Sequence, residues 1–275
     1  MNSGSSIEGF VLQNEVQIRL GIFFGVFMIM LVWELVAPRR ILSVSKLLRW
    51  SSNLGLLVVN SIVLRLLFPA AAVGMALYTA EMGWGLFNLL ELPFWLEVFA
   101  AVVLLDLAIY AQHLLMHQVP VLWRLHRVHH ADLDIDLTTG SRFHTIEIIF
   151  SMLIKGLVIL VLGPAVFAVL VFEVVLNGMA MFNHSNVSLP PLVERIVRSL
   201  FVTPDMHRVH HSIILQETNS NYGFNLSVWD RMFNTYIDQP RKGHDDMTIG
   251  IPGFRNAAQV DKLPGMLMLP FVNKS

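Results

Sequence analysis

Eight histidines stand in three patterns whose spacing suits metal binding. His113 and His117 form HxxxH, and HxxHH occurs twice, as His126, His129 and His130 and as His207, His210 and His211. Residues i, i+3 and i+4 of an α-helix lie on one side, so each pattern directs its imidazoles the same way. Imidazole suits iron, zinc, copper and nickel, and one ion takes about four to six ligands. Eight imidazoles therefore predict a site for two metal ions.

Chance does not account for the repeated pattern. With 11 histidines in 275 residues, HxxHH is expected roughly 0.02 times in a chain of this length. The alternative interpretation is that the imidazoles are ordinary core groups. Burying so many polar rings without a shared partner is costly, so we prefer metal ligation. His244 differs, because it lies in a charged segment and is expected to be solvated.

The composition is typical of a membrane protein. Hydrophobic residues make up 55% of the chain, charged residues 14%, and the mean hydropathy is +0.60. A soluble domain has about 25% charged residues. The net charge of -1 argues against a nucleic-acid partner. The absence of cysteine excludes disulfides, thiolate zinc sites, cysteine-ligated haem and iron–sulfur clusters.

Long apolar stretches must position the histidines. They cover residues 18–36, 54–78, 93–116 and 148–181. Each is long enough to span about 30 Å of hydrocarbon. The last stretch holds two arms that turn at Gly163 and Pro164, either as full spans or as a shallow re-entrant hairpin.

The loop after the first stretch carries a basic cluster, which consists of Arg39, Arg40, Lys46 and Arg49. The positive-inside rule places this loop, and with it both histidine regions, in the cytoplasm. We therefore predict an all-α polytopic membrane protein with about four transmembrane helices and a cytoplasmic helical cap that carries the dimetal site. The predicted parts are N-terminal transmembrane helices at 1–92, a catalytic domain at 93–240 and a C-terminal tail at 241–275. An amphipathic segment at 192–201 is expected to lie on the cytoplasmic leaflet.

Several polar residues near the histidines are candidates for orienting the imidazoles. Asp106 shares one stripe of the third apolar helix with the HxxxH pair, which places its carboxylate to orient a ligand. The other candidates are Glu147, Asp205, Asn221 and Asp230. Each has an ordinary alternative: Asp106 as a satisfied core group, Glu147 as an acid at a helix start, and the rest as turn or cap residues.

Together these motifs resemble the fatty acid hydroxylase superfamily, also called the sterol desaturase family, of integral-membrane non-haem diiron oxygenases. The resemblance covers about residues 90–240 and includes landmarks at residues 122–124, 142–144, 183–186, 221–223 and 229–230. It implies that the eight motif histidines bind two metals, with His144 and His184 as additional ligands or close neighbours. One departure is Thr145, where many members have proline. The resemblance also implies a lipid substrate, molecular oxygen and an external electron donor.

The chemistry of the residues agrees with two iron ions. Neutral imidazoles leave a cationic site that suits oxygen-derived anions, and iron is the redox metal that fits activation of an unreactive C–H bond. The chain has no GxGxxG after a strand and no cysteine for a cluster, so electrons must come from a separate donor. We expect a cytochrome b5-like protein, or a ferredoxin-type protein with its reductase, in that role.

Three function classes are compatible with a histidine-rich membrane protein, and the leading one is an oxygen-dependent lipid hydroxylase or desaturase. A membrane zinc hydrolase needs about three protein ligands and a general base, so the surplus of histidines and the absence of HExxH count against it. A metal transporter or storage protein should line a path across the membrane, whereas these ligands gather at one end of the spans. The residues leave open hydroxylation or desaturation, and a sterol, fatty acyl chain, ether lipid or carotenoid as substrate. The predicted location is a bacterial inner membrane, or the endoplasmic reticulum in a eukaryote.

Overall fold

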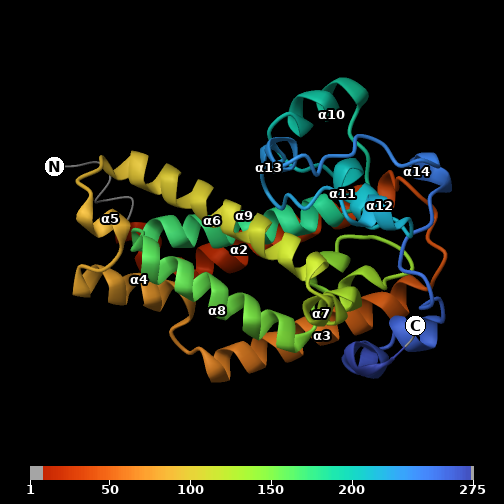
Figure 1. Ribbon diagram of the computed structural model, residues 1–275, viewed down its shortest axis with the longest axis horizontal. Coiled ribbons are helices and arrows are strands. Elements are labelled where there is room, and N and C mark those ends of the chain that lie inside the picture. Colours follow the sequence, from red (N-terminus) through yellow and green to blue (C-terminus); the bar gives the residue numbers. More distant parts are fainter. Residues whose placement is uncertain (1–8, 274–275) are drawn as a thin grey trace.

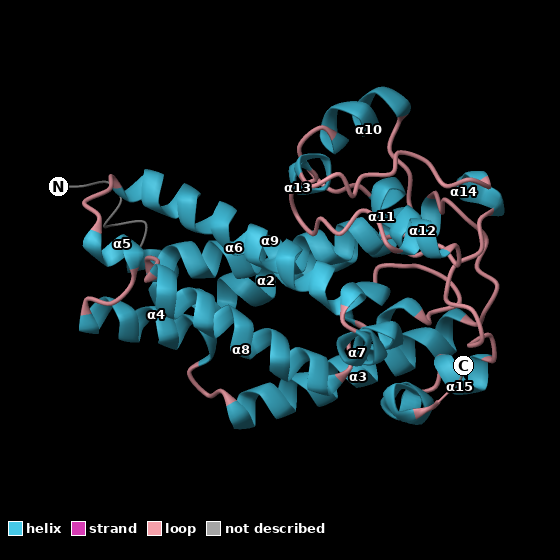
Figure 2. Cartoon of the chain, in the orientation of Figure 1, coloured by secondary structure: helices cyan, strands magenta, loops and turns pink. Residues whose placement is uncertain are grey.

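The computed structural model describes residues 9–273, and these form helices and loops without a β-strand (Figure 2). The long helices are α2 (Glu15–Val36), α3 (Lys46–Leu67), α4 (Ala71–Met82), α6 (Phe94–Gln118), α8 (Thr145–Leu162) and α9 (Val166–His184). The short ones are α5 (Leu86–Leu89), α7 (Pro120–His130), η1 (Thr139–Ser141), α10 (Pro191–Arg198), α11 (Pro204–His210), α12 (Leu215–Thr218), α13 (Val228–Met232), α14 (Gly243–Asp246), α15 (Ala257–Val260), α16 (Leu263–Met268) and η2 (Leu269–Phe271). The all-α prediction is confirmed.

Five helical segments among the described residues are long and apolar enough to cross a membrane, by length and composition. They are α2, the segment Lys46–Leu89, α6, α8 and α9. Their connections alternate between two ends of the molecule, with α5 at one end and α7 and α11 at the other (Figure 1). Several apolar helices therefore build the body, as the sequence predicted, and short helices form a cap at one end.

The second apolar stretch forms two helices, with a break at Pro69. The helix α3 ends at Leu67, and α4 begins at Ala71. Pro69 has no N–H to donate, and its ring disfavours a helical conformation at Phe68, which has φ -130° and ψ 67°.

The last apolar stretch is a helical hairpin, as predicted, and its turn is at Gly163. That residue adopts the left-handed conformation, with φ 58°, which glycine tolerates at no steric cost. The side-chain amide of Asn88 donates to the carbonyl oxygens of Gly163, at 3.0 Å, and of Trp84, at 2.6 Å. The hairpin therefore reaches the connection between α4 and α6 at the end remote from the cap, which agrees with two full-length arms rather than a shallow re-entrant loop.

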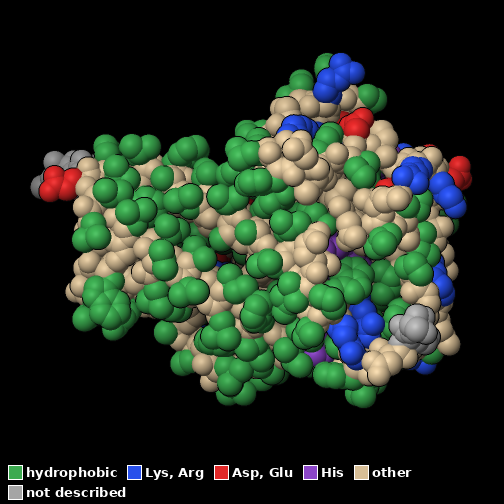
Figure 3. All heavy atoms as spheres, viewed as in Figure 1, with side chains coloured by type: hydrophobic (Ala, Val, Ile, Leu, Met, Phe, Trp, Pro, Cys, Tyr) green, Lys and Arg blue, Asp and Glu red, His purple; other side chains and the backbone are tan. Residues whose placement is uncertain are grey.

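The helical body presents apolar side chains to its surroundings (Figure 3). Phe24, Leu66 and Phe99, on three different helices, are all well exposed. Lys and Arg side chains gather instead over the cap (Figure 3). This division matches a body that contacts lipid chains and a cap that contacts water.

The cap is tied to the body by buried ion pairs. Arg49 of α3 bonds Asp132 through two contacts of 2.6 and 2.8 Å and also pairs with Asp136. The polar loop after the first HxxHH is buried, because this arginine compensates its carboxylates. The C-terminal segment packs there too, since Met266 and Leu269 join the same apolar cluster as Val128 of α7.

Candidate metal centre

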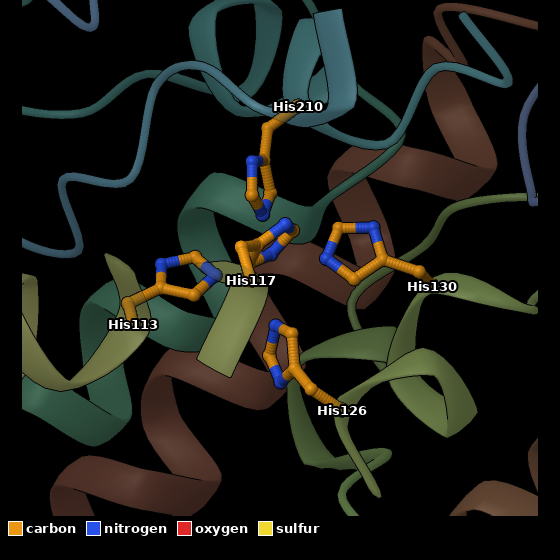
Figure 4. Close-up of side chains that lie close together, drawn as sticks. All are labelled: His113, His117, His126, His130 and His210. Atoms are coloured by element: carbon orange, nitrogen blue, oxygen red, sulfur yellow. The ribbon is translucent and has the colours of Figure 1, made fainter. Parts of the chain in front are cut away.

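Nine histidines of the described chain form two buried groups in which the ligand atoms lie within 4.8 Å of one another. The five-histidine group comprises His113, His117, His126, His130 and His210. The four-histidine group comprises His129, His184, His207 and His211. Figure 4 shows the rings of the first group pointing toward one another from α6, α7 and α11. The structure thus brings together the eight motif histidines and His184.

The two groups are adjacent because each HxxHH motif contributes to both. His126 and His130 belong to the five-histidine group, whereas His129 between them belongs to the other. The second motif divides the opposite way, with His207 and His211 in the four-histidine group and His210 in the five-histidine group. A helix advances about 100° per residue, so residues i and i+4 differ by only about 40° in direction, while i+3 and i+4 differ by about 100°. This arrangement, in which each motif contributes ligands to both groups, fits two metal ions that lie side by side.

The donor atoms suit metal ions. Nε2 of every member of the five-histidine group is buried and has no hydrogen-bond partner among the described residues. Burial, reinforced by neighbouring imidazoles, lowers the pKa of His129, His130 and His207 well below its usual value. These rings are therefore neutral and offer a lone pair, which is the form that binds a metal.

The other ring nitrogen of most members of the five-histidine group is held by the protein. Nδ1 of His126 lies 2.6 Å from Oε1 of Glu147. Nδ1 of His113 lies 2.8 Å from the carbonyl oxygen of Tyr222. His210 contacts the Ser220 carbonyl at 2.7 Å, and His117 contacts Oδ1 of Asn219 at 3.3 Å. A hydrogen bond of this kind fixes the tautomer and turns Nε2 toward the metal.

The four-histidine group has fewer such contacts and closer ring nitrogens. Nε2 of His184 lies 3.2 Å from Nε2 of His129 and 3.0 Å from Nε2 of His207. Nδ1 of His184 contacts the Ala180 carbonyl at 2.7 Å, whereas Nδ1 of His129, His207 and His211 has no partner in the described chain. Ring nitrogens this close can share a hydrogen bond or bind a common cation, so the residues fit a metal ion here as well.

Of the ten predicted ligands, His144 lies outside both groups. Its Nδ1 accepts a hydrogen bond from the backbone N–H of Ile146 at 3.2 Å, which makes it the N-cap of α8. Its Nε2 lies 3.2 Å from the carbonyl oxygen of Leu267. Both nitrogens are thus occupied, and the structure gives no support to ligation by His144.

The predicted orienting residues have different roles. Glu147 contacts His126 directly, as described above. Asp106 instead accepts hydrogen bonds from the Trp229 indole at 2.8 Å and from the Asn225 backbone at 3.3 Å. It therefore fixes the segment after Tyr222 rather than an imidazole.

Asp230 and Asn221 stabilise the loop that supplies the carbonyl contacts. Asp230 accepts hydrogen bonds from the backbone N–H groups of Tyr222 at 2.7 Å and Gly223 at 2.8 Å. Asn221 donates to the carbonyl oxygen of Met206 at 3.0 Å, which joins this loop to α11. Both act on the ligands through main-chain atoms.

The ion pairs of Asp205 among the described residues do not include an imidazole of either group. It pairs with Arg208, and one of its oxygens lies 3.8 Å from Nε2 of His244. His244 is buried, contrary to the expectation of a solvated side chain, and burial lowers its pKa to about 4.

A cavity of about 420 Å³ extends from the histidines into the helical body. His113, His126, His129 and His207 form part of its wall. Apolar side chains such as Leu57, Ile109 and Leu176 also line the cavity. Both histidine groups thus face a space shaped for an apolar molecule.

Comparison with known proteins identifies the family. The sequence profile of the fatty acid hydroxylase family matches residues 98–235, and the chain belongs to this family. It is 32% identical over 163 residues to an ornithine lipid hydroxylase of Rhizobium tropici, covering 58% of this chain and 47% of that protein. It is 33% identical over 164 residues to an alkylglycerol monooxygenase of Xenopus tropicalis, covering 58% and 35%.

A third relative is a cholesterol 25-hydroxylase of Rattus norvegicus, 29% identical over 141 residues, covering 50% of this chain and 46% of the relative. The chain thus spans less than half the length of each of these relatives. No solved structure matches the chain.

Proposed function

We propose that this protein is a membrane-bound diiron oxygenase that uses molecular oxygen and external reductant to hydroxylate or desaturate a C–H bond of a lipid. The observation that carries the proposal is that two groups of buried imidazoles form one wall of an apolar cavity within membrane-spanning helices. The family supports it, because the relatives are named as hydroxylases and a monooxygenase of lipids. Ornithine-containing lipids, glyceryl ethers and sterols are therefore the first substrates to test.

The proposed ligands of the two irons are the two histidine groups, so His144 is left out. Sets made of imidazole alone suit iron better than magnesium or calcium, which prefer oxygen ligands. When bound, iron supplies the redox chemistry needed to activate oxygen toward a C–H bond.

The protein's own contribution is to hold the ligands and to keep the reacting carbon away from water. Glu147 holds the His126 ring at 2.6 Å. Phe143 stacks on the His129 ring, with centroids 4.5 Å apart and planes inclined by 8°, and also lines the cavity. Apolar side chains such as Met116 and Leu137 exclude water around the substrate chain.

We further propose that the metal centre faces the cytoplasm of a bacterial inner membrane, or of the endoplasmic reticulum in a eukaryote, where a cytochrome b5-like or ferredoxin-type donor supplies electrons. The basic residues of the loop between α2 and α3 support this orientation. Some of them are also structural, since Arg39 pairs with Asp245 and Arg49 with Asp132.

Turnover in labelled oxygen tests the proposal. The purified, iron-loaded protein is supplied with membrane lipids, a chemical or ferredoxin-type reductant and ¹⁸O₂, and the lipids are analysed by mass spectrometry. The expected result is a lipid that gains one labelled oxygen or loses two hydrogens, and no product with His207→Ala. Lipid conversion without oxygen, hydrolysis supported by zinc alone, or metal flux through vesicles without lipid oxidation would contradict the proposal in favour of a hydrolase or transporter.

A further inference from the structure

Three charged side chains meet inside the helical body, away from the cap. Nζ of Lys155 on α8 lies 2.9 Å from Oε1 of Glu173 on α9. A guanidinium nitrogen of Arg19 on α2 lies 3.1 Å from Oε2 of the same carboxylate. The side chains of Glu173 and Lys155 are only 7% and 13% exposed. Charges in a membrane-spanning bundle are costly and mark functional sites more often than structural ones, so this ionic triad requires an explanation.

The triad lines the same cavity as the metal centre. Along α8, every fourth residue contributes to the wall: Glu147, Ser151 and Lys155. Glu147 contacts His126, Ser151 accepts a hydrogen bond of 2.7 Å from the Gln112 amide, and Lys155 reaches the triad. Eight residues of helix rise about 12 Å. The cavity therefore has a metal end and an ionic end about 12 Å apart along α8.

The two ends are separated by a largely apolar section. Met152, which lies between Glu147 and Lys155 on α8, lines this section, and Phe23, Leu64 and Leu176 also line the cavity. Gln112 also faces this section, and its Oε1 is buried without a partner in the described chain. A molecule that fills the cavity thus meets charge at one end, apolar walls along its length and imidazoles at the other end.

The charge balance of the ionic end favours an anionic group. At this end the cavity wall holds two cations, Arg19 and Lys155, and one carboxylate, Glu173, while Glu147 lines the wall at the metal end. Glu15 bonds Arg19 at 2.9 Å from outside the cavity wall and brings the whole cluster to neutrality, so an anionic ligand would compete with Glu15 for Arg19. Inside the cavity, a carboxylate or phosphate ester would accept charge-assisted hydrogen bonds from Lys155 and Arg19.

The ionic end also lies near the outside of the bundle. The Arg19 side chain is 34% exposed. A second hollow, of about 20 Å³, is bounded by Arg19, Ile22 and Phe23 of α2 and by Val174 and Gly178 of α9. The triad therefore lies close to the surface of the bundle on the side of α2 and α9.

We propose that Arg19, Lys155 and Glu173 form a binding subsite for the negatively charged end of an amphipathic lipid whose chain extends through the cavity toward the histidines. The position of the chain relative to the metals rests on the proposed function. Recognition of the charged end does not, because it requires neither iron nor turnover. The distance between the subsite and the histidines thus determines which carbon of the chain reaches the metal centre.

A series of ligands with one chain and three head charges tests the subsite. Oleic acid, oleyl alcohol and oleylamine are bound to the metal-free protein in nanodiscs, at a pH where the acid is ionised and the amine protonated. The acid is expected to bind more tightly than the alcohol, and the amine most weakly. Lys155→Gln should weaken binding of the acid by about 10-fold or more and leave the alcohol little changed. Glu173→Gln should leave the acid as tight or tighter and weaken the amine further.

Two variants control for the charge and for the position. Lys155→Arg keeps the cation and should preserve the preference for the acid. Lys242→Gln removes an exposed lysine of the cap, outside the cavity wall, and should change nothing. Equal binding of the three ligands by the wild-type protein would overturn the proposal, even if the variants fail to fold. A parallel loss of all three ligands in Lys155→Gln would assign the triad to folding alone.

Failure of this subsite and failure of the oxygenase are distinguishable. If the metal-free protein prefers the acid but the iron-loaded protein oxidises no lipid, the proposed function is contradicted and the subsite is supported. Oxidation of lipids by the iron-loaded protein, with equal binding of the three ligands to the metal-free protein, would support the proposed function and contradict the subsite.

Discussion

The two histidine groups share both HxxHH motifs but are held in place differently. In the five-histidine group, side chains and carbonyl groups contact Nδ1 of His113, His117, His126 and His210. In the four-histidine group, His184 contacts a carbonyl, while the nitrogens of His129 and His207 approach His184 itself. The protein thus fixes most rings of the first group through Nδ1, whereas in the second group it fixes only His184 in this way. The four-histidine group should therefore be the one that loses its ion first.

Removing one ligand from each group should have unequal effects and gives the largest contrast. His207→Ala leaves three imidazoles at the second site, so iron content should fall from about two to about one ion per chain, with loss of turnover. His117→Ala leaves four imidazoles at the first site, so both ions should remain, with lower affinity at that site. Iron analysis of the purified variants measures this. Equal iron loss in both variants would contradict the expected difference between the five-histidine and four-histidine groups.

Removing the carboxylate that holds His126 should weaken the five-histidine group. Glu147→Ala frees the His126 ring, and loss of a contact of this kind lowers metal affinity by about 10- to 100-fold. Competition with a chelator measures the affinity, and one of the two ions should become easier to remove. Ser151→Ala is the matched control, because Ser151 lies one turn away on the same face of α8 and bonds Gln112. Unchanged iron retention in Glu147→Ala would show that the carboxylate does not orient a ligand.

Substitution of His144 should have the smallest effect and should leave both groups intact. His144→Ala removes the N-cap of α8, which costs about 0.5–2 kcal/mol of stability. Iron content should stay at the wild-type value, and His144→Ser should restore most of the stability because serine is a good cap. Thermal unfolding and iron analysis check the two parts. Loss of one iron in both variants would return His144 to the ligand set.

Hydropathy predicted the long helices of this protein, and the histidine motifs predicted its candidate metal centre. The apolar stretches appear as long helices, and Gly163 and Pro164 mark the turn of the hairpin. The eight motif histidines predicted two ions, and the structure supplies two groups of imidazoles. The assignment of i and i+4 to one group and i+3 to the other was not predicted, since it depends on how α7 and α11 face each other.

Other features leave little trace in a single sequence. The contacts to His113 and His210 come from carbonyl oxygens of Tyr222 and Ser220, and every residue has a carbonyl. Asp106 shares a helical stripe with the HxxxH pair, yet it bonds Trp229, because a segment more than a hundred residues later packs against that stripe.

The ionic triad is hidden in the sequence for a related reason. Arg19, Lys155 and Glu173 lie on three separate helices, and they meet only through helix packing.

Anomalous diffraction at the iron edge, from crystals of the iron-loaded protein, tests the central claim most directly. Two adjacent peaks are predicted, one bounded by the five-histidine group and the other by His129, His184, His207 and His211. A single peak shared by both groups, or a second peak at His144, would contradict the assignment of one ion to each group.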